Sequence, residues 1–177
     1  LSGLGGPRST AGNWAFRQIW NAGRADALVS AVDLALAANR PGFAGMIHDT
    51  AVPSINFGLS TNPGSGGLIP DDLPLPAEPL GLTAEDFVIV ARAAVKIPRS
   101  GDWTIGVHTD EGFGLRFIGA PFASVSGNGE RDENFPEFIA LQVNIADSNT
   151  RGVLQGIAAG VYEIEFISWQ RTGAAFY

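Results

Sequence analysis

The chain has 177 residues and a net charge of −7, and only 16% of its residues are charged. Its length predicts one domain with a substantial core. The one lysine and ten scattered arginines form no basic stripe, which argues against nucleic-acid binding and against an anionic membrane surface. The absence of cysteine excludes disulfides, thiolate metal sites and cysteine nucleophiles. No run of about 18 apolar residues occurs, so the sequence predicts no membrane span.

The first part of the chain predicts an arm, a strand and a helix. Residues 1–12 are rich in Gly, Ser and Pro and are interpreted as a flexible arm or linker, followed by a single domain over residues 13–177. Aromatic side chains at alternate positions predict a strand over residues 13–20. Apolar side chains at helical spacing predict a short amphipathic helix within residues 24–38.

The middle of the chain predicts a long Gly/Pro-rich loop. Residues 46–52 and 54–60 are interpreted as short strands. In residues 61–81 the prolines remove ladder donors and the glycines cost entropy, so no regular element is expected there.

From residue 86 the sequence predicts strand after strand. Gly, Pro and Asn turns separate the alternating segments, which are residues 86–97, 103–109, 114–122, 138–146, 152–157 and 161–170. Many short strands of this kind predict an all-β sandwich or barrel.

The last strand is predicted to have one core face and one solvent face. Tyr162, Ile164 and Phe166 share one face, whereas Glu163 and Glu165 share the other, which we expect to face water. Trp169 lies on the glutamate face, so we expect its ring to be exposed and to be a candidate for stacking on a sugar ring.

Residues 97–120, "IPRSGDWTIGVHTDEGFGLRFIGA", resemble the central hairpin of the PA14 domain family. The shared pattern is an apolar strand, a Gly-aromatic turn, an acidic step followed by Gly, and a strand of the Arg-Leu type. Residues 55–76 are similar to the middle of that family and residues 154–177 to its end, while residues 13–20 and the following helix resemble the start of bacterial secreted variants. The resemblance covers most of residues 13–177.

This resemblance implies a two-sheet antiparallel β-sandwich and an accessory module at a bacterial cell surface or outside the cell. Some members of the family bind sugars through a calcium ion held by paired aspartates, with a cis peptide between the two acids. The resemblance therefore implies a Ca²⁺ site at Asp110 and Glu111, with Asp110 also contacting the ligand. Glu111 stands where the family motif has Asp, which changes the reach of the carboxylate.

Calcium takes six to eight oxygen ligands, so further side chains are needed. The loop between two predicted strands supplies one or two of Asn144, Asp147 and Asn149 in this hypothesis. Residues 126–135 contain additional amide and carboxylate oxygens. The alternative interpretation is a solvated bend at Asp110 and Glu111, with Arg116 or His108 offsetting the charge. The sequence leaves both interpretations open.

Nothing in the sequence predicts catalysis. The two histidines, His48 and His108, lie in strand-like segments, and no nucleophile or nucleotide-binding motif accompanies them. The hypothesis is therefore a non-catalytic structural or assembly subunit of a cell-surface or secreted complex, with other protein subunits or domains as partners. The alternative is a calcium-dependent carbohydrate-binding module. The low charge content favours the first hypothesis, and the acidic step favours the second.

Overall fold

The structure is a computed structural model that describes residues 3–9, 12–58, 73–77, 85–142 and 148–172. Most of these residues lie in antiparallel strands, which confirms the predicted all-β, sandwich-like fold. The large sheet has the order β2 (Met46–Val52), β1 (Trp14–Trp20), β5 (Phe87–Ile97), β12 (Gly160–Gln170), β7 (Gly112–Phe117), β10 (Ile139–Leu141) and β9 (Glu130–Arg131). The small sheet has the order β6 (Gly101–Thr109), β11 (Ser148–Ile157) and β8 (Ser124–Gly127).

A third, two-stranded pair joins β3 (Phe57–Gly58) to β4 (Leu73–Pro74) in parallel. The expectation of no regular element over residues 61–81 is wrong at Leu73 and Pro74, because a two-residue pair needs little periodicity. The strands β8 and β9 were not predicted either, because four and two residues are too few to show a clear alternation of polar and apolar side chains.

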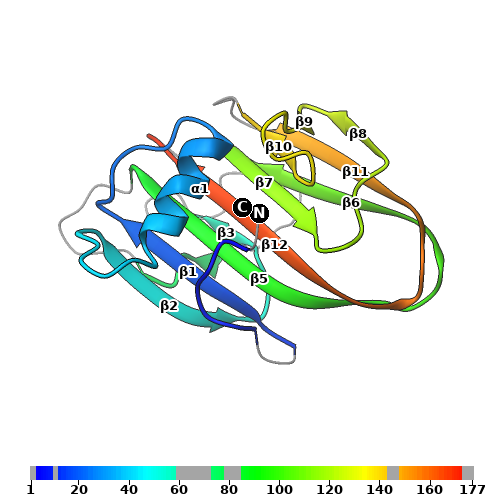
Figure 1. Ribbon diagram of the computed structural model, residues 1–177, viewed down its shortest axis with the longest axis horizontal. Helices are drawn as coiled ribbons and strands as arrows, with labels where there is room; N and C mark the ends of the chain where they lie inside the picture. Colours follow the sequence, from blue (N-terminus) through cyan, green and yellow to red (C-terminus); the bar gives the residue numbers. More distant parts are fainter. Residues whose placement is uncertain (1–2, 10–11, 59–72, 78–84, 143–147, 173–177) are drawn as a thin grey trace.

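Two tight turns carry the chain from one sheet to the other, one between β5 and β6 and one between β11 and β12. Strands β5 and β12 pair in the large sheet, and their continuations β6 and β11 pair in the small one (Figure 1). At the turns, the Ala159 N–H donates to Ser100 Oγ at 2.9 Å and the Gly156 N–H donates to Asp102 Oδ1 at 2.7 Å. These bonds join the two turns and fix the place where the chain passes between the sheets.

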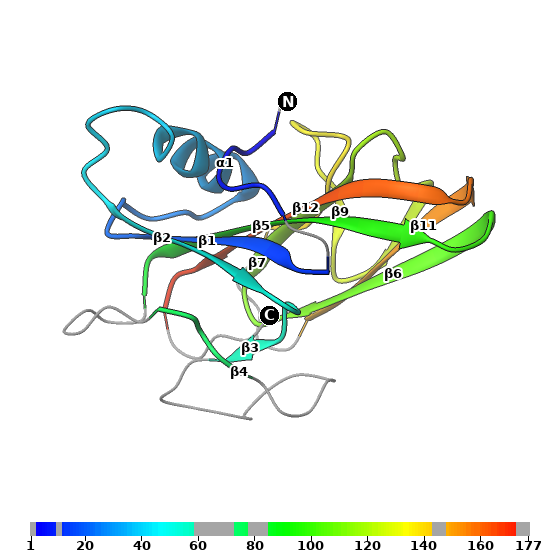
Figure 2. The ribbon, with the colours of Figure 1, turned by 90° about the horizontal axis from the view of Figure 1, so that it is seen from below.

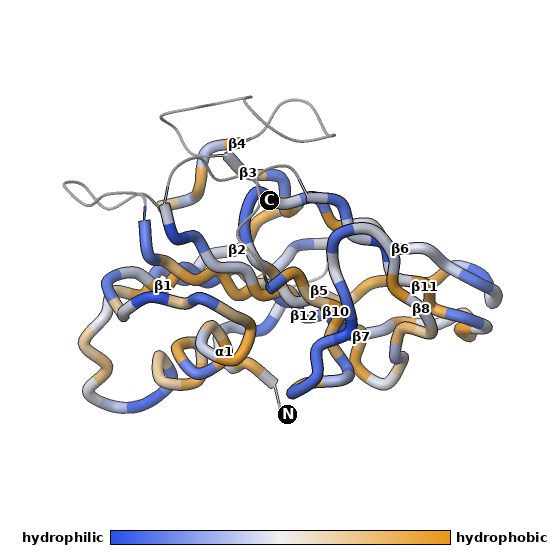
Figure 3. The backbone as a smooth tube through the Cα atoms, turned by 90° about the horizontal axis from the view of Figure 1, so that it is seen from above, coloured by the Kyte–Doolittle hydropathy of each residue, from blue (hydrophilic) through white to orange (hydrophobic). Residues whose placement is uncertain are grey.

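One hydrophobic core fills the space between the sheets. Phe16, Ile89 and Phe166 of the large sheet pack there with Leu154 of the small sheet and with Phe57 of β3. Figure 2 shows β3 and β4 on this side of the large sheet and the helix α1 (Leu28–Ala37) on the other. In Figure 3 the hydrophobic colour runs along the interior strands.

A second core lies between the large sheet and α1. Leu28, Val32 and Ala35 of the helix pack against Ile167 and other side chains from the opposite face of the sheet. The helix starts where its first N–H groups find side-chain acceptors: the Ala27 N–H donates to Ser30 Oγ at 3.1 Å, and the Leu28 N–H donates to Gln142 Oε1 at 2.9 Å. Both faces of the large sheet are therefore covered at its central strands.

The described part of the N-terminal arm is packed. Leu4 is only 1% exposed and belongs to the core beneath α1, so the expectation of a flexible arm is wrong there. Its N–H donates to Glu165 Oε1 at 3.2 Å, and its carbonyl accepts a bond from Asn39 Nδ2 at 3.1 Å. Sequence composition alone gave no sign of this anchor.

The predicted solvent face of the last strand is wrong at Glu165, which is fully buried. Arg116 is the residue of β7 directly opposite Glu165. Its Nε and Nη2 donate to Glu165 Oε2 at 2.8 and 2.5 Å. Arg92 Nε forms an ion pair with Glu165 Oε1 at 2.9 Å and bonds the exposed Glu163 through Nη2 at 2.7 Å. Arg116 also bonds Glu137 and lies over the Phe138 ring at 4.8 Å.

This arrangement predicts unequal effects for two matched substitutions on β12. Glu165→Gln removes the buried charge that Arg116 and Arg92 share and should lower the free energy of unfolding by about 3 kcal/mol. Glu163→Gln removes only the exposed partner of Arg92 and should cost less than about 1 kcal/mol. Urea denaturation of both variants measures the difference, and equal losses would contradict the buried network.

Candidate functional site

The acidic step Asp110-Glu111 lies in a bend that carries the chain from β6 in the small sheet to β7 in the large one. Thr109 Oγ1 donates to the Glu111 carbonyl at 2.8 Å, and Ser148 Oγ donates to the Thr109 carbonyl at 2.7 Å. Thr109 and Ser148 are fully buried and face each other across β6 and β11. The buried hydroxyls of Thr109 and Ser148 therefore hold the bend.

Glu111 is buried and accepts bonds from the main chain. The Arg171 N–H donates to Oε2 at 2.6 Å, and the Thr172 N–H donates to Oε1 at 3.3 Å. Its side chain is 1% exposed. The carboxylate therefore joins the bend to the chain immediately after β12.

Burial raises the pKa of Glu111 because the charged form loses its hydration, and the adjacent charge of Asp110 acts in the same direction. The two backbone N–H donors and the charge of Arg171 lower that pKa and oppose the burial effect.

The expected solvated bend is wrong, since Asp110 is 8% exposed and Glu111 less still. Arg116, expected as a counter-charge, bonds Glu165 and Glu137 instead. The described peptide bonds are all trans, so the cis bond implied for the acidic step is not present.

Trp169 packs against Gly112, the residue after this bend, and is 1% exposed. The expectation that its ring is exposed is therefore wrong. A Cβ on Gly112 would lie 2.0 Å from Trp169 Cζ2, which means that the indole packs directly against the glycine. Ser168 Oγ donates to the Gly112 carbonyl at 2.8 Å and fixes the same contact. In this position Trp169 presents no ring to a ligand in solution.

Of the remaining predicted ligands, the structure describes only Asn149. Asn144 and Asp147 lie outside the part of the chain that the structure describes. Asn149 is opposite His108 in the β6–β11 register, and its N–H donates to Asn128 Oδ1 at 2.9 Å. Because neighbouring side chains on a strand point to opposite faces, Asn149 lies on the other face of the small sheet from Ser148.

Each oxygen of the Glu111 carboxylate already accepts a main-chain N–H, so this carboxylate is engaged within the fold. Among the described residues, no group of three or more histidine, aspartate or glutamate side chains is arranged to hold a metal ion. A Ca²⁺ site that includes Asn144 or Asp147 stays a prediction.

Asp132, one of the carboxylates noted in residues 126–135, is also bonded within the fold. It is 2% exposed, and its Oδ1 accepts the N–H groups of Asn134 and Phe135 at 2.9 and 2.6 Å. Its other oxygen accepts a bond from Gln142, the residue that also holds the start of α1. Asp132 therefore shapes the loop and positions the helix.

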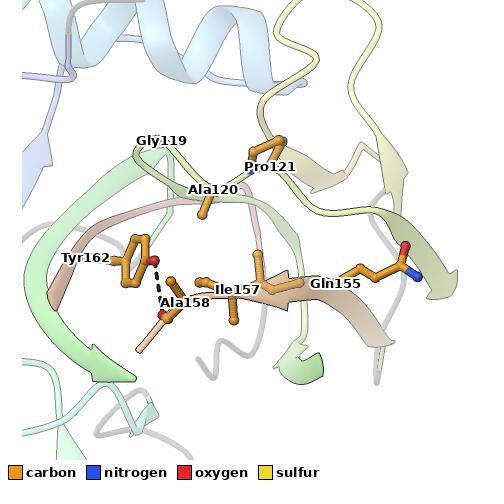
Figure 4. Close-up of a pocket in the computed structure, with 8 residues that line it drawn as sticks. Gly119, Ala120, Pro121, Gln155, Ile157, Ala158 and Tyr162 are labelled. Carbon is orange, nitrogen blue, oxygen red and sulfur yellow. Dashed lines mark hydrogen bonds between the residues drawn. The ribbon is translucent and has the colours of Figure 1, made fainter. Parts of the chain in front are cut away.

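A pocket of about 310 Å³ lies at the far end of β7 from the acidic bend (Figure 4). Its walls come from the β7–β8 connection and from β11, β12 and the turn between them, and they include Ala120, Pro121, Leu154, Gln155, Ile157 and Tyr162. The Tyr162 hydroxyl donates to the Ala158 carbonyl at 3.1 Å. The lining carries no carboxylate or imidazole, so it offers no acid–base pair.

The chain matches no protein-family model, and a search of curated proteins returns no match. The PA14 resemblance therefore stays a prediction. Within the described residues, no helix has the length and apolar character needed to cross a bilayer, and α1 has ten residues.

The contact between Gly112 and Trp169 predicts a position-specific loss of stability. Gly112→Ala places a methyl group inside the indole and should lower the melting temperature by several degrees. Gly106→Ala, on the adjacent β6, meets no atom within 4 Å and should leave the melting temperature unchanged or slightly raised. Scanning calorimetry of the two variants tests this, and equal melting temperatures would contradict the packing.

The raised pKa of Glu111 predicts a defined pH dependence. Between the ordinary glutamate value of about 4.3 and the raised folded-state value, the folded protein holds a proton that the unfolded chain has released. The contribution of Glu111 to the free energy of unfolding therefore falls as the pH rises through that window.

Glu111→Gln removes this titration. The stability difference, wild type minus variant, should fall with rising pH inside the window and be flat on both sides of it. Denaturant midpoints measured for both proteins at closely spaced pH values give the difference directly. A difference that rises with pH would show that the two N–H bonds outweigh burial.

Proposed function

We propose that the protein is a non-catalytic structural or assembly module of a cell-surface or secreted complex. The observation that carries this proposal is the exposed apolar surface on β2, the outer strand of the large sheet, where Met46 is 42% and Ile47 is 40% exposed. Apolar side chains on an exposed strand edge favour contact with another protein chain.

The environment of the buried carboxylates supports a non-catalytic role. Glu111, Asp132 and Glu165 each bond main-chain N–H groups or arginines that build the fold. The pocket beside Tyr162 adds no titratable partner of the kind that proton transfer requires. The extracellular location rests on the resemblance to the PA14 family.

Calcium-dependent carbohydrate binding stays a prediction of the same resemblance. It relied on accessible side chains at Asp110 and Trp169, and both are buried. The assembly role is therefore the better supported of the two.

Solution size and saccharide binding distinguish these functions. We expect sedimentation equilibrium to show a mass above that of one chain as concentration rises from micromolar to submillimolar. A glycan array should show no binding with calcium or with chelator. A chain that stays monomeric over the whole range would contradict the assembly role, and calcium-dependent saccharide capture would replace it with the binding role.

A further inference from the structure

The outer edge of β2 is open among the described residues. Its inner edge pairs with β1 without a break from Met46–Trp20 to Val52–Trp14. Five of its seven residues are exposed, and no described strand lies beyond it (Figure 1). Because alternate residues of an edge strand direct their N–H and C=O groups outward, β2 presents a row of unpaired backbone groups.

The strand lacks the features that usually block such an edge. Residues 46–52 contain no Lys or Pro, and their pairing with β1 has no bulge. Asp49 is their one acidic residue, and Arg17 holds its carboxylate with two bonds of 2.6 and 2.7 Å. The opposite edge of the sheet, β9, has only two residues, Glu130 and Arg131, and both are charged.

We propose that β2 pairs antiparallel with β2 of a second copy and joins the two large sheets into one. This rests on the proposed assembly function and names its partner and register. A two-fold axis normal to the sheet keeps every residue on its own face, so one residue meets its own copy at the axis.

Centring the axis on Asp49 is the register that pairs all seven residues. It places Met46 opposite Val52 and Ile47 opposite Ala51, so a long apolar side chain meets a shorter one on each face of the sheet. His48 lies opposite Thr50 on the face toward the inter-sheet core.

The charge at this edge is compatible with a second copy. Each Asp49 enters the contact already neutralised by its own Arg17, so the axis receives two ion pairs instead of two bare carboxylates. The net charge of −7 opposes association over longer distances. Added salt screens that repulsion, so the dimer should strengthen as ionic strength rises.

Because the chain has no cysteine, single substitutions give unique thiols. Residues opposite each other in antiparallel strands have Cα atoms about 4.5–5.5 Å apart, within the disulfide range of about 4.4–6.8 Å. A mixture of Ile47→Cys and Ala51→Cys proteins should therefore form a disulfide-linked dimer under mild oxidation. Alone, each variant places its two thiols about four residues apart along the strands, or about 13 Å, and should not cross-link.

A control thiol at Val161, which is 70% exposed on β12 away from this edge, should not cross-link with either variant. In a second measurement, Ile47→Lys should weaken association by about tenfold or more, and Val161→Lys should not change it.

The outcomes separate the inference from the function on which it rests. An oligomer in which the 47/51 mixture cross-links no faster than the control overturns the β2 contact and leaves an assembly role through another surface. Cross-linking of either variant alone overturns the register. A monomer at all concentrations overturns both the inference and the proposed function.

Discussion

The coverage of the large sheet on both faces decides where its charged side chains can lie. Strand β12 runs between β5 and β7, with α1 against one face and the small sheet against the other. A carboxylate in that position needs cationic partners inside the protein, because an unpaired buried charge is strongly destabilising. Glu165 finds them in Arg116 and Arg92, and it also accepts the N–H of Leu4. One side chain thus connects the central strands to the segment packed beneath the helix.

Glu111, next to the start of β7, is also buried and also bonded inside the protein. Where β12 ends, the N–H groups of Arg171 and Thr172 need acceptors, and the Glu111 carboxylate supplies both. This gives a physical reason for placing a second acid beside Asp110 in a chain with few charges. Its raised pKa follows from the same placement, because the group must be buried in order to reach those donors.

The sequence predicted the strands better than it predicted their surroundings. Side-chain alternation correctly separated Ile164 and Phe166 from Glu165 and Trp169 on β12, and these sets do lie on opposite faces. It assigned the second face to water because nothing local in the strand shows that α1 and Leu4 cover it. Beyond the helix the assignment is right for Glu163, which is exposed, and Val161 on the same face is exposed as well.

The candidate site was less predictable, because its partners are distant in sequence. The step at Asp110 and Glu111 was found from the residues, but the hydroxyl of Ser148 and the backbone after β12 reach it only through the fold. The open edge of β2 was not foreseen either, since alternation predicts a strand and does not say whether both of its sides are paired.

The low charge content that suggested an assembly subunit has two physical sources in this fold. The first is internal, because two cores around one sheet need more apolar side chains than a single sandwich interior does. This part of the composition says nothing about partners. The second is the apolar surface that the fold leaves uncovered, which includes Met46 and Ile47 on β2 as well as Ile118 after β7 and Val161 on β12.

These two uncovered regions are not equivalent. Val161 and Ile118 lie in a region where β5, β12 and β7 already satisfy one another's backbone groups, so a partner there gains mainly apolar contact. At β2 a partner gains apolar contact and a full ladder of backbone hydrogen bonds, because the outer side of the strand is unpaired among the described residues. Hydrogen bonds of a ladder also fix direction and register, which apolar contact alone does not. The edge of β2 is therefore better suited to a specific contact than the region of Ile118 and Val161.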